Sequence, residues 1–432
     1  MTESAEVFLW GGRIGIVSLA DKQGAALFEY DPLFVGAGIE PSPLAMPVRS
    51  ATYSFPVLRE ETFYSLPGML ADSLPDKFGS AVLDAWLLSQ GRTIGDLSAI
   101  DRLCYQGSRG MGALEYKPAK GASDDSCERI RVDALALLAA DILKFRESGR
   151  AALLPGMKEY GSILKVGASA GGARAKAIIG WNEATGEVRS GQVVLPDGFG
   201  YWLMKFDGLA GNGDRDVADS KGYGRIEYAY SLMAKAAGIE MSECRLWEGM
   251  HFMTRRFDRT STGEKIHMQT LGGLAHLDFN LPREYSYEQA FRVTREVVGD
   301  VRAERELFRR MAFNVLAWNC DDHVKNISYL MNPAGEWRLA PAYDLTYSYN
   351  SKSRWVSGHQ MSVAGKFTDI SKDDMIAASK VAGINEVEAR KIIGEVYEAV
   401  ARWREFADVA QVEGRQVDTI ARQLSVTGSV AL

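Results

Sequence analysis

The amino-acid sequence predicts an α+β protein that begins with a mixed β domain, continues with a β-rich lobe and ends with a mainly helical lobe. Short apolar runs separated by glycine turns fill the first part and the middle of the chain. After Asp258, apolar residues recur mostly at helical spacing, and one short hairpin interrupts the pattern. We therefore expect three domains, at residues 1–125, 126–257 and 258–432.

Composition narrows the class of protein. The 432 residues are 46% hydrophobic and 25% charged, as in ordinary globular domains, and this length favours several domains. The four cysteines form no Cys-x-x-Cys pair, so neither a disulfide framework nor a zinc site is expected. A net charge of −6 disfavours strong non-specific DNA binding. Since no long apolar run or leader is visible, we expect a cytoplasmic protein that makes no membrane contact.

The first domain should open with a β-hairpin. Residues 7–10 and 13–19 are strand-like runs on either side of Gly11 and Gly12, which we interpret as a two-residue turn. Residues 25–30 form the next strand candidate.

Helices and strands are expected along the rest of the chain. Apolar spacing predicts a helix at residues 76–90 that ends at Gly91, and the small, polar residues 117–127 are typical of a linker. Residues 327–331 and 336–339 should form a hairpin. Further strands are expected at 175–181, 201–206, 243–248 and 252–257, and helices at 133–147, 225–237, 287–298, 301–318, 373–382, 386–406 and 411–424.

The most informative residues lie at the two ends of that last hairpin. Residues 319–326 read Asn-Cys-Asp-Asp-His-Val-Lys-Asn, and residues 339–344 read Leu-Ala-Pro-Ala-Tyr-Asp. Asp321 and Asn326 have the spacing of a protein-kinase catalytic loop, and the hairpin would bring Asp344 beside them. Two carboxylates about 4 Å apart repel by roughly 4 kcal/mol at an effective dielectric of about 20, so a cation is expected. This pattern indicates phosphoryl transfer, in which one carboxylate orients a hydroxyl group while an amide and a second carboxylate hold magnesium.

Structural alternatives exist for each of these residues. Asp and Asn also form Asx turns and helix caps. Lys325 favours the functional interpretation, because it could stabilise charge on a transferred phosphoryl group. The sequence leaves the roles of Asp321 and Asp322 interchangeable. His323 has no second histidine at ligand spacing, so a structural or nucleotide-contacting part is favoured over zinc binding.

Residues for nucleotide binding are expected further upstream. Glycines in the stretch 167–176 would let main-chain amides approach phosphates, although an ordinary hairpin loop explains it equally well. Lys205 ends an apolar strand, where it could bind a phosphate with help from Glu227 or extend into solvent. Phe257 and Asp258 follow a strand, at the place where a hinge would contact adenosine. A nucleotide would then lie between the last two lobes.

With these motifs the chain resembles the HipA family of serine/threonine kinases, the toxins of bacterial toxin–antitoxin pairs. The resemblance extends over nearly the whole length, and residues 319–326, 339–344, 169–176, 256–259 and 66–75 carry it. It implies a protein-kinase-like, two-lobed fold behind the N-terminal domain, with ATP and magnesium as cofactors.

The resemblance also implies roles for single residues. Asp321 would be the catalytic base, and Asn326 and Asp344 would hold magnesium. Ser169 matches a serine whose autophosphorylation switches the kinase off, since a phosphate beside the nucleotide would repel ATP. Arg255 stands where some relatives carry an acid. The expected ATP contacts are Ala170, Gly171, Gly172, Ala173, Arg174, Ala175, Lys176, Lys205, Arg255, Phe257, Asp258, His323 and Lys325.

The resemblance further implies two partners. One is a protein substrate from the translation machinery, for example an aminoacyl-tRNA synthetase. The other is a small HipB-like helix-turn-helix antitoxin, through which DNA would mainly be contacted. Two alternatives stay open. A small-molecule kinase would use the same ATP residues, whereas a non-catalytic co-repressor would only bind the antitoxin and DNA. The retained acidic residues weigh against the co-repressor.

Overall fold

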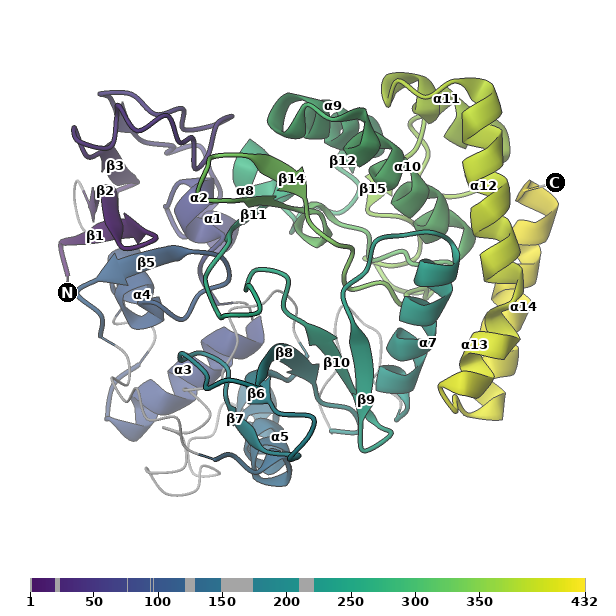
Figure 1. The fold of residues 1–432 in the computed structure, drawn as a ribbon, viewed down its shortest axis with the longest axis horizontal. Coiled ribbons are helices and arrows are strands. Elements are labelled where there is room, and N and C mark those ends of the chain that lie inside the picture. Colours follow the sequence, from purple (N-terminus) through teal and green to yellow (C-terminus); the bar gives the residue numbers. More distant parts are fainter. Residues whose placement is uncertain are drawn as a thin grey trace. The chain divides into compact units, whose positions relative to one another are not determined.

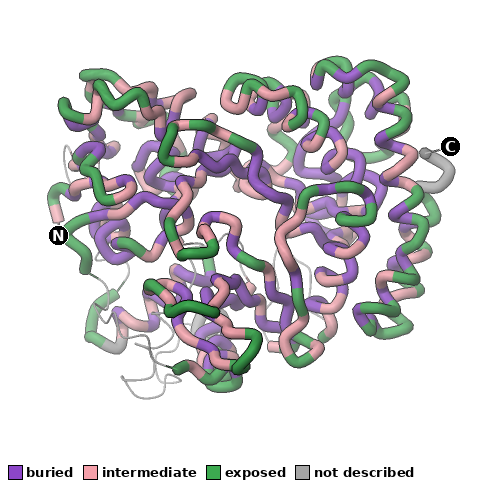
Figure 2. The backbone as a smooth tube through the Cα atoms, in the orientation of Figure 1, coloured by how far each residue is buried: buried purple, intermediate pink, exposed green. Residues whose placement is uncertain are grey.

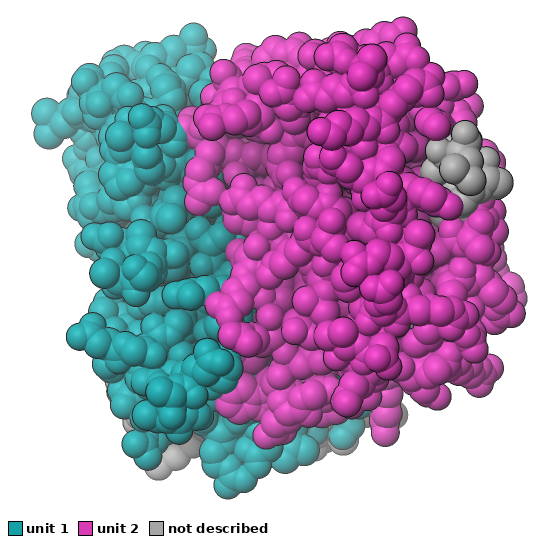
Figure 3. All heavy atoms as spheres, turned by 45° about the vertical axis from the view of Figure 1, so that its right-hand side comes forward, with its two compact units in different colours: residues 1–212, 254–276, 330–336 teal, residues 213–253, 277–329, 337–432 magenta. Residues whose placement is uncertain are grey.

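The computed structural model describes residues 2–19, 24–75, 77–93, 95, 97–120, 129–148, 174–209 and 221–431. The chain divides into two compact units, which Figure 3 shows in different colours. Unit 1 comprises residues 1–212, 254–276 and 330–336, and unit 2 comprises residues 213–253, 277–329 and 337–432. The predicted α+β class is confirmed, because unit 1 contains extended antiparallel sheets whereas long helices dominate unit 2 (Figure 1).

A five-stranded sheet forms the N-terminal part of unit 1. Its order is β4-β3-β2-β1-β5, and every neighbouring pair is antiparallel. Alternate residues of β1 are buried, so one face of this strand contributes Ala5, Val7 and Leu9 to the core. The strands are β1 (Ser4–Leu9), β2 (Gly12–Leu19), β3 (Ala26–Tyr30), β4 (Thr52–Tyr53) and β5 (Leu114–Lys117).

The predicted hairpin is present, but its turn lies one residue earlier than expected. Trp10 and Gly11 occupy the turn with φ values of 49° and 81°, and Gly12 already belongs to β2. Two positive φ values are typical of a type I′ turn, which matches the twist of the flanking strands. The indole Nε1 of Trp10 donates to the main-chain oxygen of Lys265 over 2.8 Å. This bond holds a bulky residue in a backbone conformation that usually favours glycine.

Helix α4 packs against strands β1, β2 and β5 of the N-terminal sheet. Helix α4 begins with a capping box in which the Ser98 hydroxyl accepts from the Asp101 amide and the Asp101 carboxylate accepts from Ser98. Lys120, within the predicted linker, forms an ion pair of 2.7 Å with Asp101. The helices are α1 (Glu60–Phe63), α2 (Gly68–Ala71), α3 (Lys77–Ser89), α4 (Ala99–Gln106) and α5 (Val132–Ser148).

Three antiparallel strands in the order β7-β6-β8 form a second sheet region of unit 1. They are β6 (Lys176–Trp181), β7 (Val188–Ser190) and β8 (Gly200–Lys205). Residues 176–180 of β6 and 201–204 of β8 are all buried, as the purple tube in Figure 2 shows. Strand β11 (His267–Thr270) and helix α8 (Leu271–Ala275) complete unit 1.

The N-terminal part of unit 1 is joined to the segment 254–276 by many polar contacts. Thr270 donates from its amide and its hydroxyl to the Asp72 carboxylate, at 2.6 and 2.9 Å. The Gly68 amide donates to His276 Nε2 at 3.0 Å. These bonds connect residues about 200 positions apart in the sequence, so the two parts fold together as one body.

Unit 2 is built mainly from helices. Helix α10 packs against α9 and α12, and α13 packs against α7. The elements are α7 (Tyr223–Ala236), β9 (Cys244–Trp247), β10 (His251–Arg255), β12 (Tyr285–Ser286), α9 (Tyr287–Val298), α10 (Val301–Leu316), the 3₁₀ helix η3 (Val324–Asn326), β13 (Ser328–Met331), β14 (Trp337–Leu339), β15 (Met361–Ser362), α11 (Lys372–Val381), α12 (Glu386–Ala401), α13 (Trp403–Val409) and α14 (Gly414–Ala431). The unit boundary passes through β10 and β13.

The helix expected at residues 386–406 is divided into α12 and α13 at Arg402. After this turn, the Trp403 side chain is buried and its ring lies 5.4 Å from that of Tyr230, edge to face. Its indole Nε1 donates to the Val417 main-chain oxygen at 3.1 Å. Burial of this large ring outweighs the single-helix periodicity. In the described ranges, each helix is too short or too polar to span a bilayer.

Candidate active site

Main-chain hydrogen bonds hold the segment 319–322, which follows helix α10. The Asn319 amide donates to the Asn314 oxygen at 3.0 Å, and the Cys320 amide donates to the Ser348 oxygen at 3.1 Å. The Ser348 amide in turn donates to the Trp318 oxygen at 3.1 Å. These bonds fix the path of the chain just before the two adjacent aspartates.

Asp321 and Asp322 have different environments. The Asp321 side chain keeps 25% of its surface exposed, whereas the Asp322 side chain has none. The Asp322 carboxylate accepts hydrogen bonds from Tyr287 Oη (2.8 Å), His359 Nδ1 (2.9 Å) and the Gln360 amide (2.7 Å). Because only Asp321 can meet a substrate from solvent, the geometry favours Asp321 for the chemical role that the sequence left open between the two.

Asn326 is held against Asp321. It ends the 3₁₀ helix η3, and its Nδ2 donates to the Asp321 main-chain oxygen at 2.8 Å. An amide nitrogen must face that carbonyl, since two oxygens would repel, so the orientation of the side chain is determined. The other amide atom, Oδ1, is the one that hard cations such as magnesium prefer.

Asp344 is connected to the same loop through its neighbour. Tyr343 Oη donates to the Lys325 main-chain oxygen at 2.7 Å and also hydrogen-bonds the Ser328 hydroxyl. Asp344 is half-buried and has a φ of 54°, a left-handed conformation that is uncommon outside glycine. The β13–β14 hairpin thus brings Tyr343 of the second motif against the loop 319–326, and the predicted position of the Asp344 carboxylate beside Asp321 stays a prediction.

The two basic residues of the loop lie beside an aromatic ring. Lys325 Nζ is 4.9 Å from the centre of the Phe279 ring, and the His323 ring centre is 5.7 Å from the same ring. His323 Nδ1 accepts from the Lys325 amide at 3.2 Å, and its Nε2 lies 3.9 Å from Asp321 Oδ1. His323 is thus close to the proposed base, and Lys325 shares its aromatic neighbour Phe279.

The oxygen atoms available here fit magnesium better than zinc. No cluster of three His, Cys, Asp or Glu side chains that could hold a metal occurs among the described residues. Asp344 would supply a carboxylate and Asn326 an amide oxygen, which is the ligand chemistry of a hard cation that keeps several waters.

A small cavity of about 20 Å³ lies behind this loop. Two buried atoms of its wall, Arg310 Nη2 and Asn319 Oδ1, have no hydrogen-bond partner in the part of the chain that the structure describes. The volume suffices for one water, which could accept from the arginine and donate to the asparagine. The wall also includes Tyr287, Asn314, Asp322 and Asn326.

The predicted phosphate-binding residues belong to unit 1. Lys205, at the end of β8, is half-buried and pairs in register with Lys176, the buried first residue of β6. Arg174 is half-buried and Ala175 is buried. Ser169, Ala170, Gly171, Gly172 and Ala173 lie outside the described residues. Glu227, the predicted partner of Lys205, is a buried residue of α7 in unit 2.

The predicted hinge residues have contrasting surroundings. Arg255 ends β10 and is exposed, and Phe257 is half-buried. Asp258 is completely buried, and it accepts two bonds from Arg256, of 2.8 and 2.7 Å, and one of 2.9 Å from Arg259 Nη1. Burial opposes its ionisation, but the two guanidinium groups outweigh burial, and the pKa of the Asp258 carboxyl lies below its usual value.

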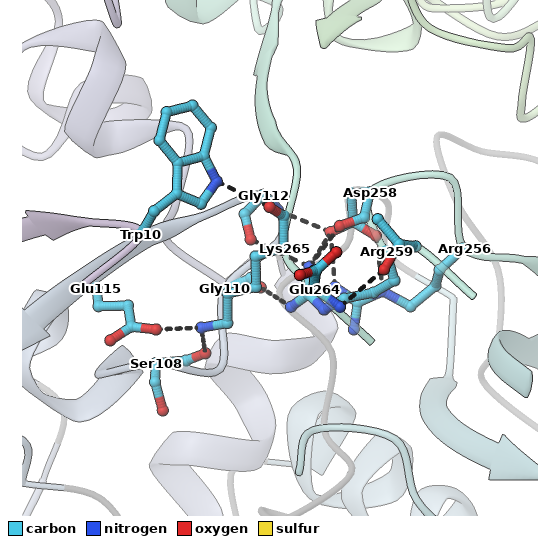
Figure 4. Close-up of polar contacts among 11 residues, drawn as sticks. Trp10, Ser108, Gly110, Gly112, Glu115, Arg256, Asp258, Arg259, Glu264 and Lys265 are labelled. Carbon is cyan, nitrogen blue, oxygen red and sulfur yellow. Dashed lines mark hydrogen bonds and ion pairs between the residues drawn. The ribbon is translucent and has the colours of Figure 1, made fainter. Parts of the chain in front are cut away.

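Figure 4 shows that this charge cluster joins the segment 256–265 to the N-terminal part of unit 1. The Gly112 amide donates to Asp258 Oδ2 at 2.7 Å. Lys265 Nζ donates to Glu115 and to the Ser108 main-chain oxygen, both at 2.7 Å. The Asp258 carboxylate therefore holds this segment in place, and its predicted contact with adenosine stays a prediction.

Two family models match the chain. The HipA N-terminal domain matches residues 5–117, and the HipA-like C-terminal domain matches residues 168–403. The chain belongs to the HipA family. A chain of the solved complex of Shewanella oneidensis MR-1 HipA, HipB and operator DNA has the same fold, with a TM-score of 0.67 and 17% identity. That similarity covers 97% of this chain and 95% of the other.

Curated relatives of this HipA-family chain match in part. The "Putative kinase Y4dM" of Sinorhizobium fredii is 24% identical over 202 residues, which are 41% of this chain and 46% of that protein. A "Putative kinase" of Haemophilus influenzae is 29% identical over 101 residues, or 22% of this chain and 29% of that protein. The chain thus spans less than half the length of the curated relatives it matches.

Sequence reasoning missed the partners of Asp322. Tyr287 and His359 lie 35 and 37 residues away from it along the chain. Tyr287 was visible only as the first residue of the helix expected at residues 287–298, and no local pattern marked His359.

Proposed function

We propose that this HipA-family chain is an ATP- and magnesium-dependent kinase that phosphorylates a serine or threonine of a protein. The joint anchoring of the two acidic motifs supports the proposal best. Asn326 donates to the Asp321 main-chain oxygen, while Tyr343, next to Asp344, donates to the Lys325 main-chain oxygen. Both curated relatives are named as kinases, which agrees with this proposal.

Each side chain then has a chemical task. Asp321, partly exposed, would accept the proton of the substrate hydroxyl as phosphate is transferred. Asn326 Oδ1 and the Asp344 carboxylate would hold magnesium, which supplies charge neutralisation on the nucleotide phosphates. Lys325 would add positive charge near the transferred group, and His323, 3.9 Å from Asp321, would add hydrogen bonding.

Other residues would supply the remaining ATP contacts. Lys205 would bind a phosphate, and the glycine-rich residues 170–176 would cover the phosphates with their main-chain amides. Arg255 and Phe257 would contact the adenosine, Arg255 through its main chain. We propose that Asp258 acts indirectly, by holding Arg255 and Phe257 in position.

A direct test uses the purified chain, labelled ATP and magnesium, with and without a chelator. We expect magnesium-dependent transfer of label to protein, abolished in Asp321→Asn. Asp408→Asn, at an exposed aspartate of α13, is the matched control and should keep full activity. Full transfer by Asp321→Asn would refute the assigned base, and label transferred only to small alcohols would favour a small-molecule kinase.

Regulation by autophosphorylation is part of the proposal. A phosphate on Ser169 would place a charge of about −1.5 to −2 beside the nucleotide phosphates and weaken ATP binding by repulsion. Mass spectrometry of the chain before and after incubation with ATP should find added phosphate on Ser169. Phosphate confined to other residues would contradict this mode of control.

We also propose partners of the kind named for the solved relative, which is a complex of HipA, HipB and operator DNA. A small helix-turn-helix antitoxin would bind this chain and provide most of the DNA contact, since the net charge of −6 is unsuited to DNA alone. The substrate would be a translation component, for example an aminoacyl-tRNA synthetase. Gel-shift assays with and without a HipB-like protein test the first point, and labelling of purified synthetases tests the second.

A further inference from the structure

Asp322 is the centre of a buried hydrogen-bond network that the proposed chemistry does not use directly. Its side chain is fully buried, and its carboxylate accepts from Tyr287, His359 and the Gln360 amide at 2.7 to 2.9 Å. Burying a carboxylate is costly unless it is fully hydrogen-bonded, and an apolar residue of the same size would often be as stable. The network therefore fixes geometry more than it adds stability.

The three donors are supported by a small β-bridge. Tyr287 is the first residue of α9 and directly follows β12, while His359 and Gln360 directly precede β15. The strands β12 and β15 pair in parallel, with Tyr285 opposite Met361 (Figure 1). Two segments about 75 residues apart in the sequence are thus fixed together before they meet Asp322.

A second arm of the network returns to the same loop. Asn319 Nδ2 donates to Asn314 Oδ1 at 2.9 Å, and Asn314 Nδ2 donates to Tyr287 Oη at 2.8 Å. Tyr287 Oη then donates to Asp322. In each of these three hydrogen bonds the donor and the acceptor are defined. The series begins at Asn319 and ends at Asp322, which belong to the same short loop.

The main chain from Asn319 to Asp322 closes a ring with the side chains of Asn314 and Tyr287, and Asp321 is part of that main chain. Its main-chain oxygen accepts from Asn326, so a shift of Asp321 would also move Asn326. We infer that Asp322 is a positioning residue that, through Tyr287 and His359, sets the proposed base Asp321 and the proposed magnesium ligand Asn326. This inference rests on the proposed function for its effect on catalysis.

The test compares two tyrosines. Tyr287→Phe removes the hydroxyl that joins the two arms of the ring. Tyr329→Phe is the matched control: Tyr329 is equally buried, and its hydroxyl bonds Thr294 of the same helix α9 at 2.8 Å, outside the ring. If both hydroxyl groups were merely structural, removing either one would change kcat to the same extent. We expect kcat to fall at least about tenfold in Tyr287→Phe with KM for ATP nearly unchanged, and both values to stay near wild type in Tyr329→Phe.

A conservative pair at His359 and an activity-free measurement complete the test. In His359→Asn the amide nitrogen can replace Nδ1 as donor to Asp322, so kcat should largely recover relative to His359→Leu. Hydrogen exchange of amides 319–326 should accelerate in Tyr287→Phe and not in Tyr329→Phe. Equal kcat in the two tyrosine variants, or unchanged exchange in Tyr287→Phe, overturns the inference. If the wild-type chain transfers no phosphate, the proposed function fails, and the exchange comparison alone decides the inference.

Discussion

Asn326 Nδ2 donates to the main-chain oxygen of Asp321 across 2.8 Å, so the proposed magnesium ligand is oriented by the proposed base's own peptide group. The two residues therefore cannot be displaced independently. We derive one prediction from this coupling and three from residues of unit 1, namely Asp258, His276 and Gly112.

Substitution of Asn326 should affect magnesium dependence as well as rate. Asn326→Leu removes both the donor and the oxygen ligand, and we expect kcat to fall by about 100-fold or more. Asn326→Asp keeps an oxygen ligand but sets it against the Asp321 carbonyl, so an intermediate loss is expected. Magnesium titrations of phosphate transfer measure both effects. Asn385→Asp, which preserves the α12 cap that accepts from the Glu388 amide at 3.0 Å, should behave like wild type.

Asp258→Asn should destabilise the fold in a pH-dependent manner. The pKa of Asp258 is lower in the folded chain than in the unfolded chain, so its ion pairs stabilise the fold fully above about pH 4 and less as pH falls below that value. Breaking a buried ion pair costs about 3 to 5 kcal/mol, so the difference between wild type and variant should be greatest at neutral pH and shrink in acid. Urea unfolding across this range measures it. The control is Glu386→Gln, which breaks an exposed ion pair with Arg390 and should cost under about 1 kcal/mol of stability. If the stability difference between Asp258→Asn and wild type stayed the same at every pH, the low pKa of Asp258 would be contradicted.

His276 should make the fold sensitive to mild acid. Burial lowers its pKa to about 4, and the neutral ring accepts from the Gly68 amide. Between about pH 6.5 and pH 4 the unfolded chain binds a proton that the folded ring does not. The free energy of unfolding therefore decreases as the pH is lowered across this interval.

We expect His276→Gln, which keeps an acceptor, to reduce that loss by about 2 kcal/mol, a value lowered for the partial exposure of the ring. His267, whose burial also lowers its pKa to about 4, should supply the slope that remains. Unfolding measured at several pH values gives the comparison, and an unchanged slope in the variant would contradict the burial of a neutral His276.

Gly112 should tolerate no side chain. It has a φ of 76°, and a Cβ atom there would approach the Met268 amide nitrogen to 2.9 Å. Gly91, with a φ of 72° and open space around it, is the matched position. Gly91→Ala should cost only the left-handed backbone term of about 1 to 2 kcal/mol, whereas Gly112→Ala should cost clearly more. Equal thermal stabilities would argue against the close packing of Gly112.

Sequence patterns predicted the elements whose ends carry local signals. Helix α9 occupies residues 287–298 as expected, because Ser286 and Gln289 form a capping box and Gly299 ends the helix in a left-handed conformation. The first turn was misplaced by one residue, since no local rule favours Trp10 at positive φ. Its indole bond to Lys265, 255 residues away, stabilises that choice.

The candidate site was predictable only where it is local in sequence. Asp321, Asn326 and the hairpin that leads to Asp344 follow from spacing within 26 residues. The contrast between Asp321 and Asp322 depends on Tyr287, His359 and the β12–β15 bridge, which are tertiary features. The nucleotide contacts expected in residues 170–173 lie outside the described ranges and stay predictions.

The bonds from residues 68–115 to the segment 254–276 limit how this chain can be divided into fragments. A fragment that began at the linker would take the Gly112 amide away from Asp258 and the Gly110 and Gly112 main-chain oxygens away from Arg259, and it would bring the Asp258 environment into contact with water. It would also deprive Thr270 and Lys265 of their carboxylates. The amino-terminal region accordingly belongs to the same folded unit as residues 254–276, and shortened versions of the chain should be insoluble before they lose any proposed activity.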